Sequence, residues 1–250
     1  MRLKDKVVVI TGGGRGMGKA YSLAAAREGA KVVVNYRSDA SSARKVVEEI
    51  REANGQALAV QADIGIQEQS RRLIAAAVKE YGTIDVLVAN AGILHKASVM
   101  EHTEEMFDDC YRTNIKGNFF VAQAAGEAMM PLKAGKIIFC ASIAALVGEH
   151  NLLAYTASKG AILSMSRVFA LELAPYNIQV NVVLPGTTRT DMSHHVLADS
   201  LMSSTLVDPI PLGRVGCPED LVGAILFFAS KDSDWCTGQS LVVDGGFCSK

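Results

Sequence analysis

Seven short runs of apolar, mostly β-branched residues recur along this chain, and most are separated by stretches long enough for a helix. The runs occupy residues 6–11, 31–36, 57–60, 84–89, 136–141, 178–184 and 239–243. They are continuous rather than alternating, which predicts strands that are buried on both faces. The helix-length stretches include residues 40–53, 67–80, 103–130, 155–174 and 218–230. This pattern predicts an α/β fold: a doubly wound, seven-stranded parallel sheet of the Rossmann type with helices on both faces.

One domain accounts for the whole chain, residues 1–250. With 250 residues, 49% of them hydrophobic, the chain can bury a substantial core. No internal repeat and no Pro/Ser-rich linker marks a second domain. Residues 187–216, which include Pro209 and Pro211, are too long for an ordinary connection and are expected to form a substrate-binding lid within the domain.

Charge and cysteine content narrow the class of partner. A formal net charge of −1 gives no field that would attract nucleic acid or an anionic membrane, so a small molecule is the expected partner. The apolar run at 221–229 is too short to span a bilayer. Five cysteines without a C-x-x-C pair indicate free thiols in a reducing compartment, so we expect a cytoplasmic protein.

Five glycines in TGGGRGMG, residues 11–18, form a loop between the first expected strand and a helix beginning near Met17. The usual dinucleotide spacing, G-x-G-x-x-G, fits in no register. A triphosphate loop comes closer, with Gly13, Gly18 and Lys19, but Ala20 stands where a magnesium ligand is needed. A strand, a glycine loop and a helix are the setting for a pyrophosphate on a helix N-terminus. A dinucleotide is therefore favoured over a triphosphate.

Tyr155 and Lys159 lie four residues apart at the start of an expected helix, which places them on one face. A fixed cation beside a phenol favours the phenolate, so the lysine is expected to lower the pKa of Tyr155 toward a range useful for proton transfer. By itself, Y-x-x-x-K is also common on solvated helices, and that alternative is open at this point.

These features occur with several others in an order that resembles the short-chain dehydrogenase/reductase family. The elements are TGGGRGMG at 11–18, Asp63, NAG at 90–92, Asn114, Ser142, YTASK at 155–159, PGTTRT at 185–190 and TGQSLVVDGG at 237–246. They span nearly the whole chain, and the glycine spacing joined to Ser, then Tyr thirteen residues later and Lys four beyond is specific. The resemblance implies that the glycines bind the pyrophosphate of a nicotinamide dinucleotide.

The resemblance also implies a catalytic set. Tyr155 would be the general acid/base, Lys159 would lower its pKa and hold the nicotinamide ribose, and Ser142 would orient the substrate oxygen. Asn114 would support a water-mediated proton path to the lysine. The alternative for Ser142 and Asn114 is capping or turn hydrogen bonding.

A cofactor site follows from the same resemblance. Its expected residues are Gly12, Gly14, Arg15, Gly16, Met17, Gly18, Arg37, Asp63, Ile64, Asn90, Ala91, Gly92, Tyr155, Lys159, Pro185, Gly186, Thr188 and Thr190. Asp63 would lie near the adenine, and a turn-forming role is its alternative. His150, His194 and His195 have no second ligand at metal spacing, so no metal site is expected.

The end of the second strand indicates which cofactor is preferred. An NAD enzyme usually carries an acidic residue there, whereas this chain reads Asn35-Tyr36-Arg37-Ser38. Arg37 and Arg15 could together bind a 2′-phosphate, which favours NADP(H). If Arg37 is only solvated and Arg15 touches only the adenine, NAD(H) would serve as a weaker or dual cofactor.

The resemblance implies hydride exchange between NADP(H) and a ketone, aldehyde or secondary alcohol, because the four-residue Tyr–Lys spacing is that of ketone reductases rather than enoyl reductases. The expected substrate residues are Leu94, Ser142, Ala144, Glu149, Leu152, Thr187 and Met192, with Val196 and Leu201 also in the lid. A 3-oxoacyl-acyl-carrier-protein reductase is the alternative. Such reductases present two basic residues near the site mouth to meet the carrier protein, and the corresponding positions here are Lys133 and Tyr176, so only one is basic and carrier-protein delivery is disfavoured. A non-catalytic NADP(H) sensor is a second alternative. Helices 103–130 and 155–174 are expected to assemble a homotetramer.

Overall fold

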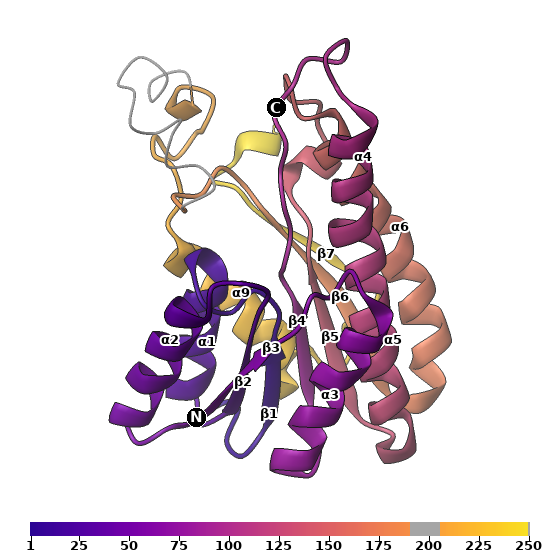
Figure 1. Cartoon of the computed structure of the whole chain (residues 1–250). Coiled ribbons are helices and arrows are strands. Elements are labelled where there is room, and N and C mark those ends of the chain that lie inside the picture. The colour runs from indigo at the N-terminus through magenta and orange to yellow at the C-terminus, as the bar shows by residue number, and fades with distance from the viewer. Residues whose placement is uncertain (191–205, 250) are drawn as a thin grey trace.

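The computed structural model describes residues 1–190 and 206–249 (Figure 1). Among these residues, seven strands form one parallel sheet in the order β3-β2-β1-β4-β5-β6-β7. The strands are β1 (Val7–Ile10), β2 (Lys31–Tyr36), β3 (Gln56–Gln61), β4 (Val86–Ala89), β5 (Gly135–Cys140), β6 (Ile178–Pro185) and β7 (Ser240–Val243). The order reverses between β1 and β4, so the predicted doubly wound fold is confirmed.

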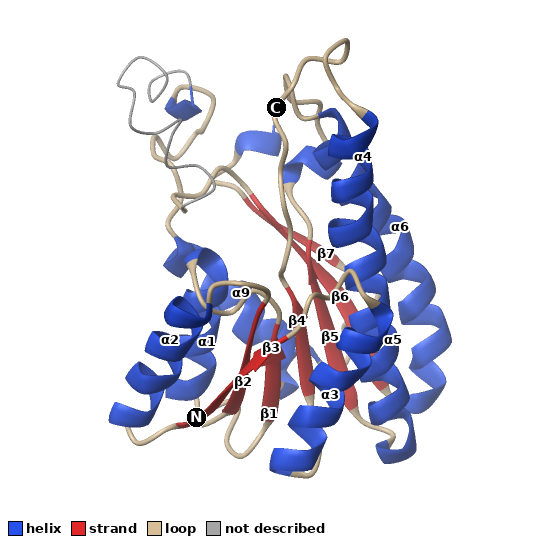
Figure 2. Ribbon diagram, viewed as in Figure 1, coloured by secondary structure: helices blue, strands red, loops and turns tan. Residues whose placement is uncertain are grey.

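Helices cover both faces of the sheet (Figure 2). One layer holds α1 (Gly16–Arg27), α2 (Ala40–Glu52) and α9 (Pro218–Ala229). The other holds α3 (Gln67–Tyr81), α4 (Glu104–Cys110), α5 (Asn118–Met129) and α6 (Leu153–Leu173). Short 3-10 helices occur at Met130–Leu132 (η2), Ile143–Ala145 (η3), Ala174–Tyr176 (η4), Lys231–Ser233 (η5) and Phe247–Ser249 (η6).

The continuous apolar runs are explained by the two cores. In β1, Val7 and Val9 pack into the core under α3, α5 and α6, whereas Val8 and Ile10 pack into the core under α1, α2 and α9. Successive side chains of a strand point to opposite faces, so a strand between two helix layers needs an apolar residue at every position.

A π-helical turn interrupts the long helix expected over 103–130. Residues Tyr111–Gly117 (η1) form this turn between α4 and α5. Isolated π turns inside helices are rare and occur often at functional sites. A Cβ on Gly117 would lie 2.8 Å from Ile64 Cγ1, so this glycine lets the loop after β3 approach closely. Sequence periodicity did not distinguish this turn from an ordinary α-helix.

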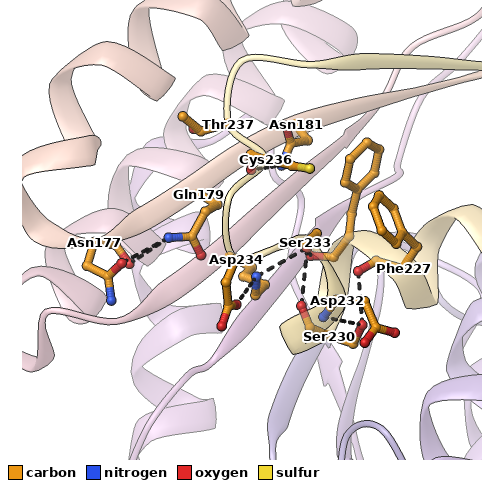
Figure 3. Close-up of polar contacts among 12 residues, drawn as sticks. Asn177, Gln179, Asn181, Phe227, Ser230, Asp232, Ser233, Asp234, Cys236 and Thr237 are labelled. Carbon is orange, nitrogen blue, oxygen red and sulfur yellow. Dashed lines mark hydrogen bonds and ion pairs between the residues drawn. The ribbon is translucent and has the colours of Figure 1, made fainter.

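Polar contacts attach the last strand to the sheet (Figure 3). Asn181 of β6 donates to Cys236 O at 2.7 Å, and its Oδ1 accepts from Gln239 N at 3.0 Å. Thr237 Oγ1 accepts from Val180 N at 3.1 Å. These bonds set the register in which β7 enters beside β6. Trp235, in the same connection, is fully exposed.

The base of the expected lid is joined to the domain by backbone contacts. Thr188 and Gly216 form an isolated parallel bridge, and Gly216 N donates to Thr187 O at 3.0 Å. Met192, His194, His195, Val196 and Leu201 lie outside the described residues. Within residues 1–190 and 206–249, no helix is both long and apolar enough to cross a bilayer.

Candidate active site

The predicted site residues gather at one edge of the sheet because parallel strands place their carboxyl ends together. Gly12 follows β1, Asn90 follows β4, Ser142 follows β5 and Pro185 ends β6. Since β1, β4, β5 and β6 are consecutive neighbours in the sheet, these four positions form a single row.

The glycine loop packs directly against the first turn of α1. Gly12 has φ +62°, a backbone conformation that favours glycine, and a Cβ on Gly18 would clash with the carbonyl oxygen of Gly12. Asn35 braces the loop: its Oδ1 accepts from Gly12 N at 3.3 Å and its carbonyl accepts from Gly13 N at 2.9 Å. The free N–H groups at the start of α1 therefore face the same edge as the loop.

Asn90 joins this loop to the end of β4. Thr11 Oγ1 accepts from the backbone N–H groups of Asn90 and Ala91, at 2.9 Å each, and Asn90 Nδ2 donates to Thr11 O at 3.0 Å. Asn90 Oδ1 is buried and has no hydrogen-bond partner in the described part of the chain. A buried acceptor without a partner requires a donor from elsewhere. The glycine loop at residues 11–18, called the glycine cradle below, and the Asn90 acceptor together fit a dinucleotide lying across β1 and β4.

Tyr155 and Lys159 lie on the first turns of α6, as predicted. Lys159 Nζ is 5.6 Å from the centroid of the Tyr155 ring and donates to Cys140 O at 2.8 Å. Lys159 is buried, whereas Tyr155 is half-buried. A Cβ on Gly92 would lie 3.5 Å from the ammonium, so the glycine after Asn90 and Ala91 leaves that side of the lysine open.

The pKa of Tyr155 differs from the sequence-based expectation. Burial raises it to about 12, and the negative charge of Glu149 adds to the rise, while hydrogen bonding with Ser142 opposes it. Burial also lowers the pKa of Lys159 to about 8. The expected lowering of the tyrosine pKa by the lysine is therefore not found, because desolvation of the phenol is the larger effect here.

Asn114 lies inside the π turn, fully buried, and is bound on two sides. Its Oδ1 accepts from Ile93 N at 2.8 Å, and its Nδ2 donates to Ile93 O at 2.9 Å and to Ser158 Oγ at 2.9 Å. Ser158 is the neighbour of Lys159, so Asn114 is linked to the helix turn that carries the lysine. Ser142 caps η3, where its Oγ accepts from Ala144 N at 3.2 Å.

Asp63 forms a turn after β3, which is the alternative to a role near the adenine. Its Oδ1 accepts from Gly65 N at 2.9 Å, and its Oδ2 accepts from Arg112 Nη1 at 3.0 Å. Asp63 and Ile64 follow β3, so both lie at the same sheet edge as the glycine loop.

The two arginines expected at a 2′-phosphate also lie at this edge. Arg15 precedes α1 and Arg37 follows β2, and both side chains are exposed. Asp39 occupies the N-cap of α2, where it accepts from Ser42 N at 3.0 Å. Hydrogen bonds with Ser42 lower the pKa of Asp39, and the charge of Arg15 contributes to this shift. An acidic residue therefore does lie near Arg15, three positions beyond the end of β2.

The expected substrate residues follow β4, β5 and β6, and the loops after β4 and β5 are joined to each other. Ala97 and Leu152 form a parallel bridge, and Ala97 N donates to Asn151 O at 3.0 Å. Ala144 and Leu152 are buried and Leu94 is half-buried, so this side is largely apolar. Desolvation of the carboxylate raises the pKa of Glu149, although the residue is exposed at the surface, and the charge of Lys96 opposes that shift. Thr187 lies at the base of the expected lid, and Met192 lies outside the described residues.

Lys133 and Tyr176 do not lie near the site mouth of this chain. Lys133 follows η2 and precedes β5, and Tyr176 ends η4 and precedes β6. Both positions are at the amino ends of their strands, whereas Ser142 follows the carboxyl end of β5. Within one chain, the residues aligned with a carrier-protein contact are therefore at the opposite end of the sheet.

Three residues that position the site are not among the site residues predicted from the sequence. Thr11, Asn118 and Ser158 each bond a residue of the predicted site: Asn118 Nδ2 donates to Ala91 O at 3.2 Å and to Asn114 O at 2.8 Å. Their proximity to recognised motifs was the available signal, since Ser158 lies within YTASK and Asn118 is four residues after Asn114. Within the described residues, no group of three or more His, Cys, Asp or Glu side chains is arranged to hold a metal ion. All five cysteines are free thiols.

Comparisons with known proteins agree with this geometry. A family model described as enoyl-(acyl carrier protein) reductase matches residues 12–248. The chain is 40% identical over 250 residues to L-rhamnose 1-dehydrogenase (NAD(P)(+)) of Azotobacter vinelandii, covering 98% of both chains. It is 37% identical over 261 residues to tetrahydroxynaphthalene reductase of Pyricularia oryzae, covering 98% of this chain and 90% of that one.

Solved structures give the same result at the level of the backbone. A gluconate 5-dehydrogenase from Burkholderia cenocepacia, in complex with NADP and tartrate, superimposes with a TM-score of 0.95 at 33% identity, covering 100% of this chain and 97% of that one. A short-chain type dehydrogenase/reductase from Mycobacterium marinum superimposes with a TM-score of 0.95 at 36% identity, covering 99% and 97%. The chain belongs to the short-chain dehydrogenase/reductase family of oxidoreductases.

Proposed function

We propose that this protein is an NADP(H)-preferring oxidoreductase that exchanges a hydride between the cofactor and a ketone, an aldehyde or a secondary alcohol. One observation carries the proposal: Tyr155, Lys159 and Ser142 lie together at the sheet edge that also carries the glycine cradle and the unpartnered Asn90 oxygen. Acid/base groups and a dinucleotide cradle are the two requirements of carbonyl reduction.

The proposed mechanism assigns a task to each of these residues. A nicotinamide cofactor, when bound, would supply or accept the hydride. As negative charge develops on the substrate oxygen, we assign the Ser142 hydroxyl to donate a hydrogen bond to it and the Tyr155 hydroxyl to donate a proton. Because burial raises the pKa of Tyr155 to about 12, the phenol is neutral at physiological pH and retains the proton it must donate.

Lys159 and Asn114 support this proton transfer. The lysine ammonium is adjacent to the Tyr155 ring and favours the phenolate that remains after the proton has left. Asn114, through Ser158 and Ile93, holds the neighbouring backbone and is proposed to stabilise a water-mediated path toward the lysine. In the oxidation direction the same residues act in reverse.

Arg15 and Arg37 support the preference for NADP(H), since both are exposed at the edge where β1 and β2 end. Two of the named relatives support a nicotinamide cofactor: the L-rhamnose 1-dehydrogenase is described with NAD(P)(+), and the gluconate 5-dehydrogenase was crystallised with NADP. Asp39 beside Arg15 supports retention of NAD(H) as a weaker cofactor, because a carboxylate repels a phosphate.

The substrate is proposed to be a medium-sized free carbonyl compound or alcohol. Leu94, Ala144 and Leu152 support an apolar contact surface. Glu149, whose charge acts on Tyr155, favours a substrate with additional hydroxyl groups, as in the relatives named for L-rhamnose and gluconate. The Tyr–Lys spacing of four residues favours a ketone over the enoyl substrate in the family model's description. The positions of Lys133 and Tyr176 disfavour delivery on a carrier protein within one subunit.

Assembly and location complete the proposal. The free thiols support a reducing compartment, so we place the protein in the cytoplasm. A homotetramer is proposed, with the exposed faces of α5 and α6 as one subunit contact.

A panel of ketones, aldehydes and sugars read by NADPH absorbance, run beside NADH, tests this function. Tyr155→Phe should lower turnover by roughly two to four orders of magnitude, the contribution of a lost general acid, with NADPH affinity nearly unchanged. Tyr176→Phe, at the opposite end of the sheet, is the matched control and should retain full activity. Near-normal turnover in Tyr155→Phe would remove the mechanism, and NADPH binding without turnover of any substrate would favour a cofactor sensor.

A further inference from the structure

Arg112 lies on the π turn that carries Asn114, and its guanidinium contacts two carboxylates from different segments. Nη1 donates to Asp63 Oδ2 at 3.0 Å, and Nη2 lies 3.6 Å from Asp109 Oδ1. The Arg112 side chain is 38% exposed, and ion pairs this accessible contribute little to stability. These two contacts of Arg112 are therefore expected to act mainly by fixing the position of the π turn relative to the loop after β3 and the end of α4.

The loop after β3 packs against Arg112 and the rest of the π turn. A Cβ on Gly65 would lie 3.0 Å from Arg112 Nη1 and 3.1 Å from its Cγ, so the arginine side chain crosses directly over this glycine. Asp63 is held for this contact by its own turn, because its other carboxylate oxygen accepts from Gly65 N. Further along, Gly117 contacts Ile64. The cofactor-side loop and the π turn thus fit together over residues 63–65.

The loop after β4 contacts both the π turn and the last turn of α4, which precedes it. Ile93 binds the Asn114 carboxamide through both its N–H and its carbonyl. His95, two residues later, has its Nε2 3.4 Å from Asp109 Oδ2. Arg112 contacts the other oxygen of Asp109, so Asp109 lies between Arg112 and His95, and His95 Nε2 makes no hydrogen bond within the described residues.

We propose that Arg112 is a positioning residue: by bridging Asp63 and Asp109, it sets the register of the π turn so that the Asn114 carboxamide faces Ile93 and Ser158. A π turn is intrinsically less favourable than the α-helix on either side of it, and it persists where tertiary contacts hold it. Arg112 supplies such contacts on the outer side of the turn, and Asn114 supplies those on the inner side. An effect of Arg112 on turnover rests on the proposed oxidoreductase function, whereas its effect on the hydrogen bonds between Asn114 and Ile93, called the structural link below, does not.

Hydrogen exchange at the Ile93 amide tests the structural link without turnover or cofactor. Arg112→Met keeps a side chain of similar length and removes both ion pairs, so the Ile93 amide should exchange about tenfold faster as its bond to Asn114 opens more often. Arg112→Lys, which keeps the positive charge but has a single nitrogen to contact the two carboxylates, should show protection of the Ile93 amide between that of Arg112→Met and that of the wild type. Arg71→Met, which breaks the exposed pair between Arg71 of α3 and Glu127 of α5, is the control and should leave Ile93 unchanged. An unchanged Ile93 rate in Arg112→Met would overturn the proposal.

Turnover then tests whether Arg112 acts through Asn114. Arg112→Met should lower kcat about tenfold with a change in Tm below about 5 °C, since an exposed ion pair adds little stability. In an Asn114→Ala background, the same substitution should cause no further loss of kcat. An equal loss in both backgrounds would overturn the proposal. If the wild-type protein reduces no carbonyl compound, the proposed function fails, while the exchange of Ile93 still decides the role of Arg112.

Discussion

Burial shifts the pKa of Tyr155 and of Lys159 in opposite directions, and in each case it favours the neutral form. The pKa of Tyr155 rises to about 12 and that of Lys159 falls to about 8. Between these two values, the phenol is protonated while the lysine has lost its charge. The lysine, rather than the tyrosine, is then the group that titrates near physiological pH.

The pH dependence of carbonyl reduction should show this order. Reduction uses a protonated Tyr155 and a charged Lys159, so kcat/KM should be level below about pH 8 and should fall about tenfold per pH unit above it, as the ammonium loses its proton. Initial rates of carbonyl reduction with NADPH, recorded from about pH 6 to about pH 10, measure this pH dependence. Lys159→Arg keeps its charge across that range, so its decline should move to higher pH. A wild-type profile that stays level to pH 10 would contradict the assignment.

Arg15 and Arg37 should distinguish the two cofactors. Their combined replacement by alanine should raise the Kd for NADPH roughly ten- to hundredfold, because charge-assisted hydrogen bonds to the 2′-phosphate are lost, while the Kd for NADH changes by less than about twofold. Isothermal titration with each cofactor gives both values. Arg167→Ala, an exposed arginine on α6, is the control. Equal losses for NADPH and NADH would show that the two arginines do not contact that phosphate.

At the scale of elements, the contact between the glycine loop and α1 depends on a missing side chain. Gly18→Ala would force its Cβ into the Gly12 carbonyl, so the loop or the helix must shift. We expect lost NADPH binding and a Tm lower by several degrees, as for other overpacked sites. Thermal unfolding curves recorded with and without NADPH measure both the loss of binding and the lower Tm.

Gly223→Ala is the matched control for this element. Gly223 is inside α9, and a Cβ there meets nothing within 4 Å in the described chain. Replacing a helical glycine by alanine should stabilise the fold by about 0.5–1 kcal/mol and leave cofactor affinity unchanged. If both variants behaved alike, the close approach of Gly18 to the loop would not be what requires glycine.

At the scale of the whole molecule, a groove of ≈ 540 Å³ lies between α5 and α6 on the outer surface. Its lining is Phe119, Gln123, Gly126, Glu127, Met130, Met165, Val168, Phe169, Glu172 and Leu173. Val168 is 53% exposed and the neighbouring Leu171 is 76% exposed, so this face of a single subunit leaves apolar side chains in contact with solvent. A second copy of this face would bury them across a two-fold axis.

Light scattering at micromolar concentration should therefore report a tetramer. Val168→Glu would place a charge in the proposed contact and should lower the measured mass to that of smaller species, because an unpaired carboxylate is costly to bury. Met100→Glu, at a residue 93% exposed in the loop before α4, is the control and should not change the mass. A monomeric wild-type protein would contradict the predicted assembly.

Local properties of the sequence determined the seven strands, the helix that carries Tyr155 and Lys159, and the gathering of the site at the carboxyl edge. Apolar runs and turn residues are local signals, and parallel strands bring their ends together whatever the details of packing. The motifs at residues 11–18 and 155–159 were recognisable for the same reason, because each lies within a single turn or loop.

The tertiary structure alone decided the electrostatics of the site and the shape of the helix that holds Asn114. The pKa of Tyr155 depends on how much water the fold removes, and Lys159 bonds a carbonyl 19 residues away. Asp63 meets Arg112 across 49 residues, and the π turn forms where the loop after β3 packs against it. These features depend on which distant segments come into contact, and a single sequence read by local pattern contains no direct signal for such contacts.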